Sequence, residues 1–228
     1  MAGKTAAVTT VLAIAGCGPR LEIALGAPSL PAPAFVALAG PTPRSDLIVA
    51  AIDLLLRAAG LTGEAIGTVV ASRGPGSFTG IRVALATAQG IAHAHGIPAH
   101  GFSSLLVQAL RTPLRPCLAV QPARRDHVYA QLFTGRGDGA GEAGEPTVVA
   151  IRELVAATVP VVAPVGLRLP DGTPIAAVVT TAAEALLALA ATVVRPDTAT
   201  LVPVYLEQPQ VEPPSLPHPP WQRSRRAS

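Results

Sequence analysis

The stretch that decides the fold of this chain is Ser72-Arg73-Gly74-Pro75-Gly76-Ser77-Phe78-Thr79-Gly80-Ile81-Arg82. The apolar, β-branched run at residues 68–71 predicts a buried strand, and the glycines and proline after it predict a tight turn. From Gly80 to about His95 the apolar spacing is helical, and Gly96-Ile97-Pro98 ends the helix. Because a strand, a glycine-rich turn and a helix can present backbone N–H groups to an anion, a phosphate loop is the first interpretation to test.

The residues of this stretch do not carry phosphate-loop chemistry. A Walker loop ends in a lysine, whereas the only lysine of the chain is Lys4. Thr79 stands at the third glycine of the dinucleotide fingerprint, and the turn has no acidic residue for Mg²⁺. A tight turn with Ser77 and Thr79 as capping hydroxyls is therefore favoured over nucleotide binding. We assign these residues to a structural loop: Gly74, Gly76, Ser77, Thr79, Gly80 and Arg82.

Small residues recur along the helix at a spacing of four, which lets a second helix approach closely. They form two rows, Ala84, Ala88 and Ala92, and Ala86, Gly90 and Ala94. Ile81 and Leu85 supply larger contacts. Small residues on two sides predict packing on two sides, against the helix's own sheet and against a second helix. That second helix belongs either to the same chain or to a partner subunit.

The central stretch resembles the signature of one protein family. Residues 73–82, with Leu85-Ala86-Thr87-Ala88-Gln89-Gly90 after them, are similar to the TsaB (YeaZ) family, bacterial subunits needed to make threonylcarbamoyladenosine in tRNA. Weaker similarities follow in the same order, at residues 123–130 and at Pro203-Val204-Tyr205-Leu206. The resemblance covers most of the chain up to about Leu206.

This resemblance implies an α/β fold, the actin-like ATPase (ASKHA) fold, with two lobes that each hold a mixed sheet flanked by helices. We expect an N-terminal lobe at residues 1–112, a C-terminal lobe at 113–206 and a disordered tail rich in proline and arginine at 207–228. Strands are predicted at residues 10–16 and 21–25. Five prolines in residues 27–43 predict an irregular connection, after which Ser45 caps a helix at 45–59.

Composition and charge reduce the number of possible functions. Half of the 228 residues are hydrophobic but only 3% are aromatic, so the core is built from aliphatic side chains. The formal charge of +3 equals the contribution of Arg223, Arg225 and Arg226, which leaves a neutral body without a basic face for nucleic acid. We therefore expect only indirect contact with tRNA. Cys17 and Cys117 have no metal-ligand spacing and fit reduced thiols in the cytoplasm.

Two apolar segments allow membrane-related alternatives. Lys4 and the run that ends at Cys17 resemble a lipoprotein signal, which would make the chain a lipid-anchored envelope protein. Residues 175–194 carry one charge, Glu184, and have the length of a membrane span. The capping-box pattern from Thr181 to Glu184 instead predicts a strand before Thr180 and a helix after it. We favour the alternatives without membrane association in both cases.

Departures from the family pattern point to a protein without catalysis. In active ATPases of this fold the first hairpin carries an aspartate, but residues 12–17 hold no carboxylate. Arg44-Ser45-Asp46 stands where relatives tend to have His-Ser-Glu, and Pro122 where an aspartate is common. The charged turn at residues 124–127 is expected to be solvated. We assign no catalytic residue, no metal site and no bound cofactor; the alternative is an ATP-hydrolysing or metallopeptidase-like enzyme of the same fold.

The resemblance implies a scaffold subunit of the tRNA-modifying complex, bound to a TsaD-type catalytic subunit and working with a TsaE-type ATPase. ATP would be used by these partners. Helices 45–59 and 80–95 are expected to form the exposed apolar surface for the partner, and a homodimer through the same helices is possible. The residues assigned to this interface are Ile48, Ile52, Leu55, Phe78, Ile81, Ala84, Leu85, Ala88 and Ala92.

Overall fold

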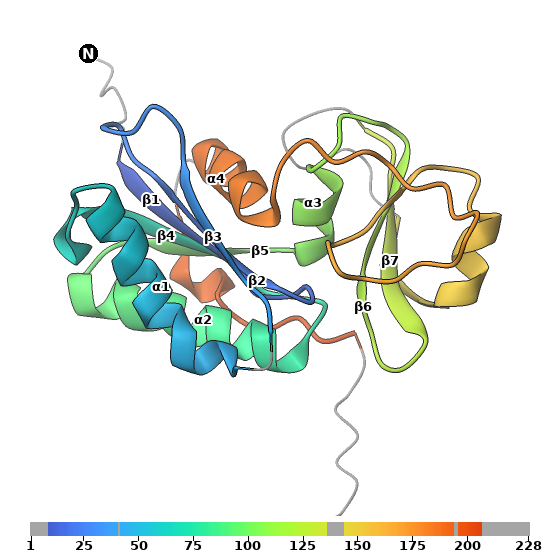
Figure 1. Ribbon diagram of the computed structural model, residues 1–228, viewed down its shortest axis with the longest axis horizontal. Coiled ribbons are helices and arrows are strands. Elements are labelled where there is room, and N and C mark those ends of the chain that lie inside the picture. The colour runs from blue at the N-terminus through green and yellow to red at the C-terminus, as the bar shows by residue number, and fades with distance from the viewer. Residues whose placement is uncertain (1–8, 41, 136–143, 194–195, 207–228) are drawn as a thin grey trace, which may run out of the picture.

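A computed structural model describes residues 9–40, 42–135, 144–193 and 196–206. It contains two sheets side by side, each with helices packed on it (Figure 1). The predicted tail at 207–228 lies outside the described residues, as does Lys4.

The first sheet has five strands in the order β3-β2-β1-β4-β5. Its members are β1 (Thr10–Ala15), β2 (Leu21–Gly26), β3 (Ala34–Leu38), β4 (Ile66–Ser72) and β5 (Ala99–Phe102). The strands β1, β2 and β3 pair antiparallel, whereas β1, β4 and β5 pair parallel. Since β1 lies at the centre, a lipoprotein signal ending before Cys17 would remove the middle strand of this sheet.

Helices cover both faces of this sheet (Figure 1). The helices α1 (Arg44–Ala58) and α2 (Phe78–His95) pack on the face to which Leu12 and Ile14 point. On the opposite face α4 (Ala182–Thr192) packs against the alternate residues of β1. Successive side chains of a strand point to opposite faces, so a central strand buried on both sides is apolar throughout.

The second sheet has the order β8-β7-β6-β9. It consists of β6 (Cys117–Pro122), β7 (His127–Phe133), β8 (Thr147–Ala150) and the short β9 (Val161–Val162). The helix α3 (Ser104–Ala109) packs on β6 and lies between the two sheets. Three short 3₁₀ helices complete the described structure: η1 (Gly63–Ala65), η2 (Ile151–Ala156) and η3 (Thr198–Thr200).

The C-terminal part of the chain does not stay in the second lobe as expected. Residues 182–192 and 196–206 lie on the first lobe, where α4 packs on β1 and β2 and Leu201 joins the core cluster that contains residues of α1 and α2. The backbone N–H of Val204 donates to the carbonyl oxygen of Arg73 at 2.7 Å. The second sheet begins with β6 at Cys117, whereas α4 and Leu201 belong to the packing of the first lobe.

Some local predictions are confirmed and others are wrong. Thr181 and Glu184 form the predicted capping box, but the strand expected directly before it is absent, and residues 175–180 form only an isolated bridge at Ile175. The connection at 27–43 was expected to be irregular, but it contains β3. Since β3 is the edge strand of its sheet, it tolerates the prolines on either side of it. Pro43, not Ser45, occupies the cap position of α1, without a side-chain hydrogen bond. Among the described residues, no helix is long and apolar enough to span a membrane.

Candidate functional site

Eight of the nine residues expected to face a partner lie in the core of the first lobe. They are Ile48, Ile52, Leu55, Ile81, Ala84, Leu85, Ala88 and Ala92. Only Phe78, at the start of α2, is exposed, to 42%. The assignment of these eight side chains to an exposed surface is therefore wrong. Helical periodicity identifies an apolar face, and here the chain's own sheet and neighbouring helix cover that face.

The outer side of the same helices carries different apolar residues. Val49 and Leu54 of α1 are 68% and 60% exposed. A groove of about 430 Å³ runs between α1 and α2, with Val49 and Ile91 among its walls and Gly90 among its lining residues. A Cβ atom at Gly90 would have no atom from outside its own helix within 4 Å. This face is open to another molecule, as exposed apolar patches at interaction sites are.

The turn between β1 and β2 is held by the side chain of Arg44 in the first turn of α1. The Arg44 guanidinium donates to the carbonyl oxygens of Gly16 at 3.1 Å and Gly18 at 3.0 Å, and also to that of Pro19. Burial lowers the pKa of this guanidinium below its ordinary value. The turn therefore directs carbonyl oxygens onto a cation, the reverse of a loop that presents N–H groups to phosphate.

The central loop, residues 72–80, packs around this turn. The hydroxyl of Ser72 accepts from the backbone N–H of Gly16 at 3.0 Å and from the thiol of Cys17 at 3.1 Å. The N–H of Ser77 donates to the carbonyl oxygen of Cys17 at 2.8 Å. A Cβ atom at Gly80 would overlap the carbonyl oxygen of Gly16, so only glycine allows this approach. Three residues of the predicted structural loop contact the turn: Gly76, Ser77 and Gly80.

The other residues of the loop prediction have different surroundings. The hydroxyl of Ser77 caps α2 by accepting from the N–H of Gly80 at 3.3 Å, as predicted. Thr79 does not serve as the cap and lies exposed in the first turn of the helix. Gly74 has a positive φ of 112° and lies against the carbonyl oxygen of Val204, where a Cβ atom would overlap it.

An exposed aromatic cluster joins the start of α2 to the C-terminal segment. The rings of Phe78 and Tyr205 are 5.4 Å apart between centroids. The Arg82 guanidinium lies 3.9 Å from the centre of the Phe78 ring, and its Nε donates to the Tyr205 hydroxyl at 3.4 Å. This contact joins the central stretch to residues 203–206 of the C-terminal segment.

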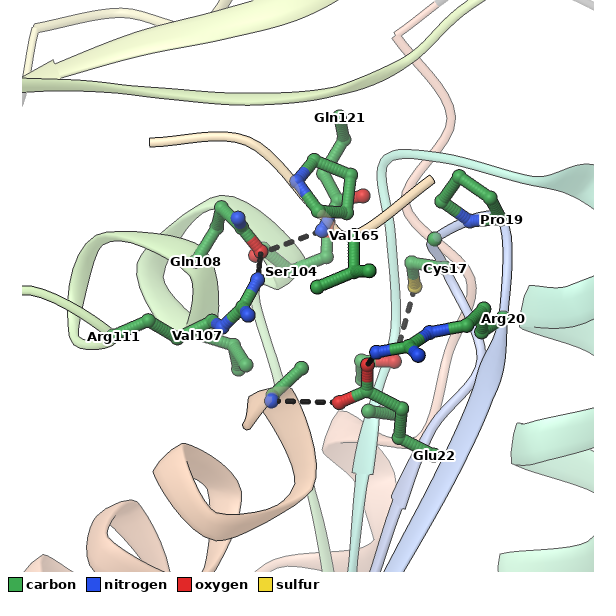
Figure 2. Close-up of a pocket in the computed structure, with 15 residues that line it drawn as sticks. Cys17, Pro19, Arg20, Glu22, Ser104, Val107, Gln108, Arg111, Gln121 and Val165 are labelled. Atoms are coloured by element: carbon green, nitrogen blue, oxygen red, sulfur yellow. Dashed lines mark hydrogen bonds and ion pairs between the residues drawn. The ribbon is translucent and has the colours of Figure 1, made fainter. Parts of the chain in front are cut away.

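A cavity of about 20 Å³ lies between the lobes, surrounded by charged and amide side chains (Figure 2). The buried carboxylate of Glu22, on β2, accepts from Arg20 at 3.2 Å and from the backbone N–H of Ala182 at 2.8 Å. Arg111, which is 2% exposed, donates to Oε1 of Gln108 at 3.2 Å. Burial lowers the pKa of Arg111, and the charge of Glu22 opposes that shift. Sequence reasoning missed this cluster, although a lone glutamate inside the apolar run of β2 was a signal.

Cys17 lies beside the central loop but is not activated as a nucleophile. Burial raises the pKa of the Cys17 thiol to about 11, so at neutral pH it is protonated and weakly nucleophilic. The charged turn at residues 124–127 is exposed at the end of the second sheet, as expected. No group of three or more histidine, cysteine, aspartate or glutamate side chains within the described ranges could hold a metal ion.

Comparisons with known proteins decide the family. A family model described as "TsaD: tRNA N6-adenosine threonylcarbamoyltransferase" matches residues 44–210. The solved structure of YeaZ from Pseudomonas aeruginosa aligns with 87% of this chain and 100% of that chain, with a TM-score of 0.69 and 26% sequence identity. The chain belongs to the TsaB (YeaZ) family. The predicted actin-like ATPase fold, with two lobes of mixed sheets and helices, is thereby confirmed.

Sequence relatives of this TsaB (YeaZ) family chain match shorter stretches. The TsaB protein of Escherichia coli (strain K12) is 29% identical over 119 residues, which are 50% of this chain and 52% of that protein. An uncharacterized protein of Mycobacterium leprae (strain TN) is 45% identical over 85 residues, 37% of this chain and 23% of that protein. The chain thus spans about half the length of the first of these relatives and about a quarter of the second.

Proposed function

We propose that this chain is a non-catalytic subunit for the synthesis of threonylcarbamoyladenosine in tRNA, where it binds and supports a TsaD-type catalytic subunit. The observation that carries the proposal is the contact of the Arg44 side chain, from α1, with the β1–β2 turn. Active ATPases of this fold carry an aspartate in that hairpin, and residues 12–17 have no carboxylate. A phosphate brought to the turn would meet carbonyl oxygens already bound to Arg44.

The space between the lobes supports the same proposal. Pockets that hold small molecules measure roughly 300–1,000 Å³. The interlobe cavity measures about 20 Å³ and is lined by residues of both lobes. Closed in this way, the cleft has no room for a nucleotide. We therefore assign the use of ATP to the partner subunits, of the TsaD type and the TsaE type.

For the partner we propose the outer face of α1 and α2. The support comes from the two highly exposed side chains Val49 and Leu54 and from the groove that includes Gly90. Apolar residues of a partner helix that enter this groove would bury surface that the free chain leaves in water. A second copy of the chain could use the same face, and tRNA would be reached only through the partner. We place this complex in the cytoplasm.

The test is a matched pair of substitutions, Val49→Arg and Val148→Arg. Val49 lines the groove, whereas Val148 is 39% exposed on β8 in the other lobe. Each tagged variant is used to recover partners from its own cells, after circular dichroism has shown that both are folded. We expect the Val49 variant to lose a TsaD-type protein that wild type and the Val148 variant retain. A buried position such as Ala88 is unsuitable, since arginine there would disrupt the core.

The proposal is wrong if wild type recovers no TsaD-type protein, or if both arginine variants recover it equally. Restoration of threonylcarbamoyladenosine in cells depleted of their own TsaB protein tests the role in tRNA. ATP hydrolysis and zinc content of the purified chain test the enzymatic alternative. Stoichiometric zinc or a turnover of ATP by the chain alone would contradict a non-catalytic role.

A further inference from the structure

Two amide side chains in the interlobe cavity have buried polar atoms with no protein hydrogen-bond partner in the part of the chain that the structure describes. These atoms are Nε2 of Gln108 and Oε1 of Gln121, whose side chains are 0% and 3% exposed. Both residues line the same cavity, together with Arg20, whose Nε is also buried without a partner (Figure 2). Such atoms are rare in native proteins, so their concentration around one cavity calls for a ligand.

The chemistry of the three atoms defines that ligand. Nε2 of Gln108 and Nε of Arg20 are donors, and Oε1 of Gln121 is an acceptor. A metal cation would not accept from the two donors, and an anion would leave the Gln121 carbonyl oxygen unmatched. A water molecule can accept two hydrogen bonds and donate two.

The size of the cavity agrees with one water molecule. A space on the order of 10–15 Å³ is needed to hold one. The cavity provides about 20 Å³ by the same measure. Side chains from the β1–β2 turn, from α3 and from β6 meet there. A ligand at this point touches both lobes at once.

We propose that the interlobe cavity binds one structural water molecule that joins the two lobes. The water accepts from Nε2 of Gln108 on α3 and donates to Oε1 of Gln121 on β6, in a cavity lined by residues of both lobes. The cleft that admits a nucleotide in active ATPases of this fold is thus closed here by a hydrated polar link. This inference does not depend on the proposed partner.

The first test is a high-resolution crystal structure of the wild-type chain, with a second crystal soaked in bromide. We expect a single peak of solvent density within hydrogen-bond distance of the Gln108 and Gln121 amides, and no anomalous signal from bromide. Bromide in the cavity would overturn the proposal in favour of an anion site. A cavity without density, or direct pairing of the two amides, would overturn it as well.

The second test is a double-mutant cycle in solution with Gln108→Met and Gln121→Leu. These two side chains share no hydrogen bond with each other, so the water provides the hydrogen-bonded route that couples them. Gln121→Leu alone should raise the equilibrium constant for unfolding roughly tenfold. In the Gln108→Met background, Gln121→Leu should raise this equilibrium constant by a factor several-fold smaller. Loss of the Gln108 contact to Arg111 occurs in both variants that carry Gln108→Met and therefore cancels from the cycle.

Gln131→Leu is the matched control for the cycle, because Gln131 lies on the paired strand β7 and does not line the cavity. Its effect should be the same in the wild-type and the Gln108→Met backgrounds. Additive effects of Gln108→Met and Gln121→Leu would show that the two amides act independently. That result would overturn the water link even if both single variants are destabilised.

Discussion

The guanidinium of Arg44 donates a hydrogen bond to the carbonyl oxygen of Gly18, 26 residues earlier in the chain, at a distance of 3.0 Å. This contact joins the first turn of α1 to the β1–β2 turn. The same side chain also bonds the carbonyl oxygens of Gly16 and Pro19, so one residue holds three carbonyl groups of the turn. These bonds fix the β1–β2 turn to the start of α1.

Arg44→Ala should lower the free energy of unfolding by about 1.5–3 kcal/mol, the range for hydrogen bonds made by a charged group. Urea denaturation followed by circular dichroism measures the change. Arg57→Ala is the control, because Arg57 forms an exposed pair with Asp53 and should contribute under about 1 kcal/mol. Equal effects of the two substitutions would contradict the role given to Arg44.

Two glycines of α2 should respond to alanine in opposite directions. Gly90 is exposed and has open space around it, so Gly90→Ala should raise the free energy of unfolding by about 0.5–1 kcal/mol through helix propensity. Gly80→Ala would force a Cβ atom onto the carbonyl oxygen of Gly16, which should cost about 1–3 kcal/mol. Thermal unfolding of both variants and of wild type shows whether each substitution raises or lowers the stability. Stabilisation by Gly80→Ala would refute the close packing of the loop on the turn.

Glu22→Gln should weaken the attachment of α4 to the first lobe. The carboxylate bonds both Arg20 and the N–H of Ala182, and its charge faces the buried Arg111. Loss of that charge should lower the free energy of unfolding by about 1.5–3 kcal/mol, measured by urea denaturation. Glu64→Gln, at an exposed position, should change the free energy of unfolding by no more than about 0.5 kcal/mol. If the Glu22→Gln variant is as stable as wild type, the Glu22 carboxylate does not help to hold α4 on the first lobe.

Acidification should loosen the C-terminal segment through His100. Its Nδ1 accepts from the backbone N–H of Asp197 at 3.1 Å, which requires the neutral ring. Burial lowers the pKa of His100 in the folded chain; the charge of Asp197 opposes this shift and that of Arg73 adds to it. Because the folded pKa lies below the unfolded value, the contribution is complete above about pH 6.5 and is lost as the pH falls through the folded pKa.

The measurement is amide hydrogen exchange of η3 in wild type and in His100→Asn, at a pH above and a pH below that window. Asparagine keeps an acceptor that does not titrate. Wild type should lose protection at the lower pH relative to the variant, and His93→Asn, at an exposed position of α2, should behave as wild type. Equal protection of wild type and His100→Asn at both pH values would contradict the prediction.

Both cysteines should resist thiol reagents in the native chain. Burial raises the pKa of Cys17 to about 11 and also raises that of Cys117, so few thiolates form near neutral pH. Labelling with a maleimide, followed by mass spectrometry, should be slow in buffer and complete in denaturant. Rapid native labelling of Cys17 would show that the β1–β2 turn opens readily.

Much of the first lobe was predictable from local pattern. The apolar run into β4, the glycine-rich turn and the helical spacing of α2 each depend on residues close together in the chain. The capping box at Thr181 likewise lies within four residues of sequence. The edge strand β3 was missed because none of its five residues is fully buried and prolines surround it.

By itself the sequence determined the order of strands, turn and helix in the first lobe, and its central stretch determined the family. Only the tertiary structure decided which neighbours cover each apolar face. It placed Ile52 and Ala88 in the core and left Val49 exposed. It also brought Glu22 to Ala182, 160 residues away, and Arg44 to Gly18. The physical reason is that periodicity along a helix records which side is apolar, whereas the identity of the covering surface depends on contacts between distant parts of the chain.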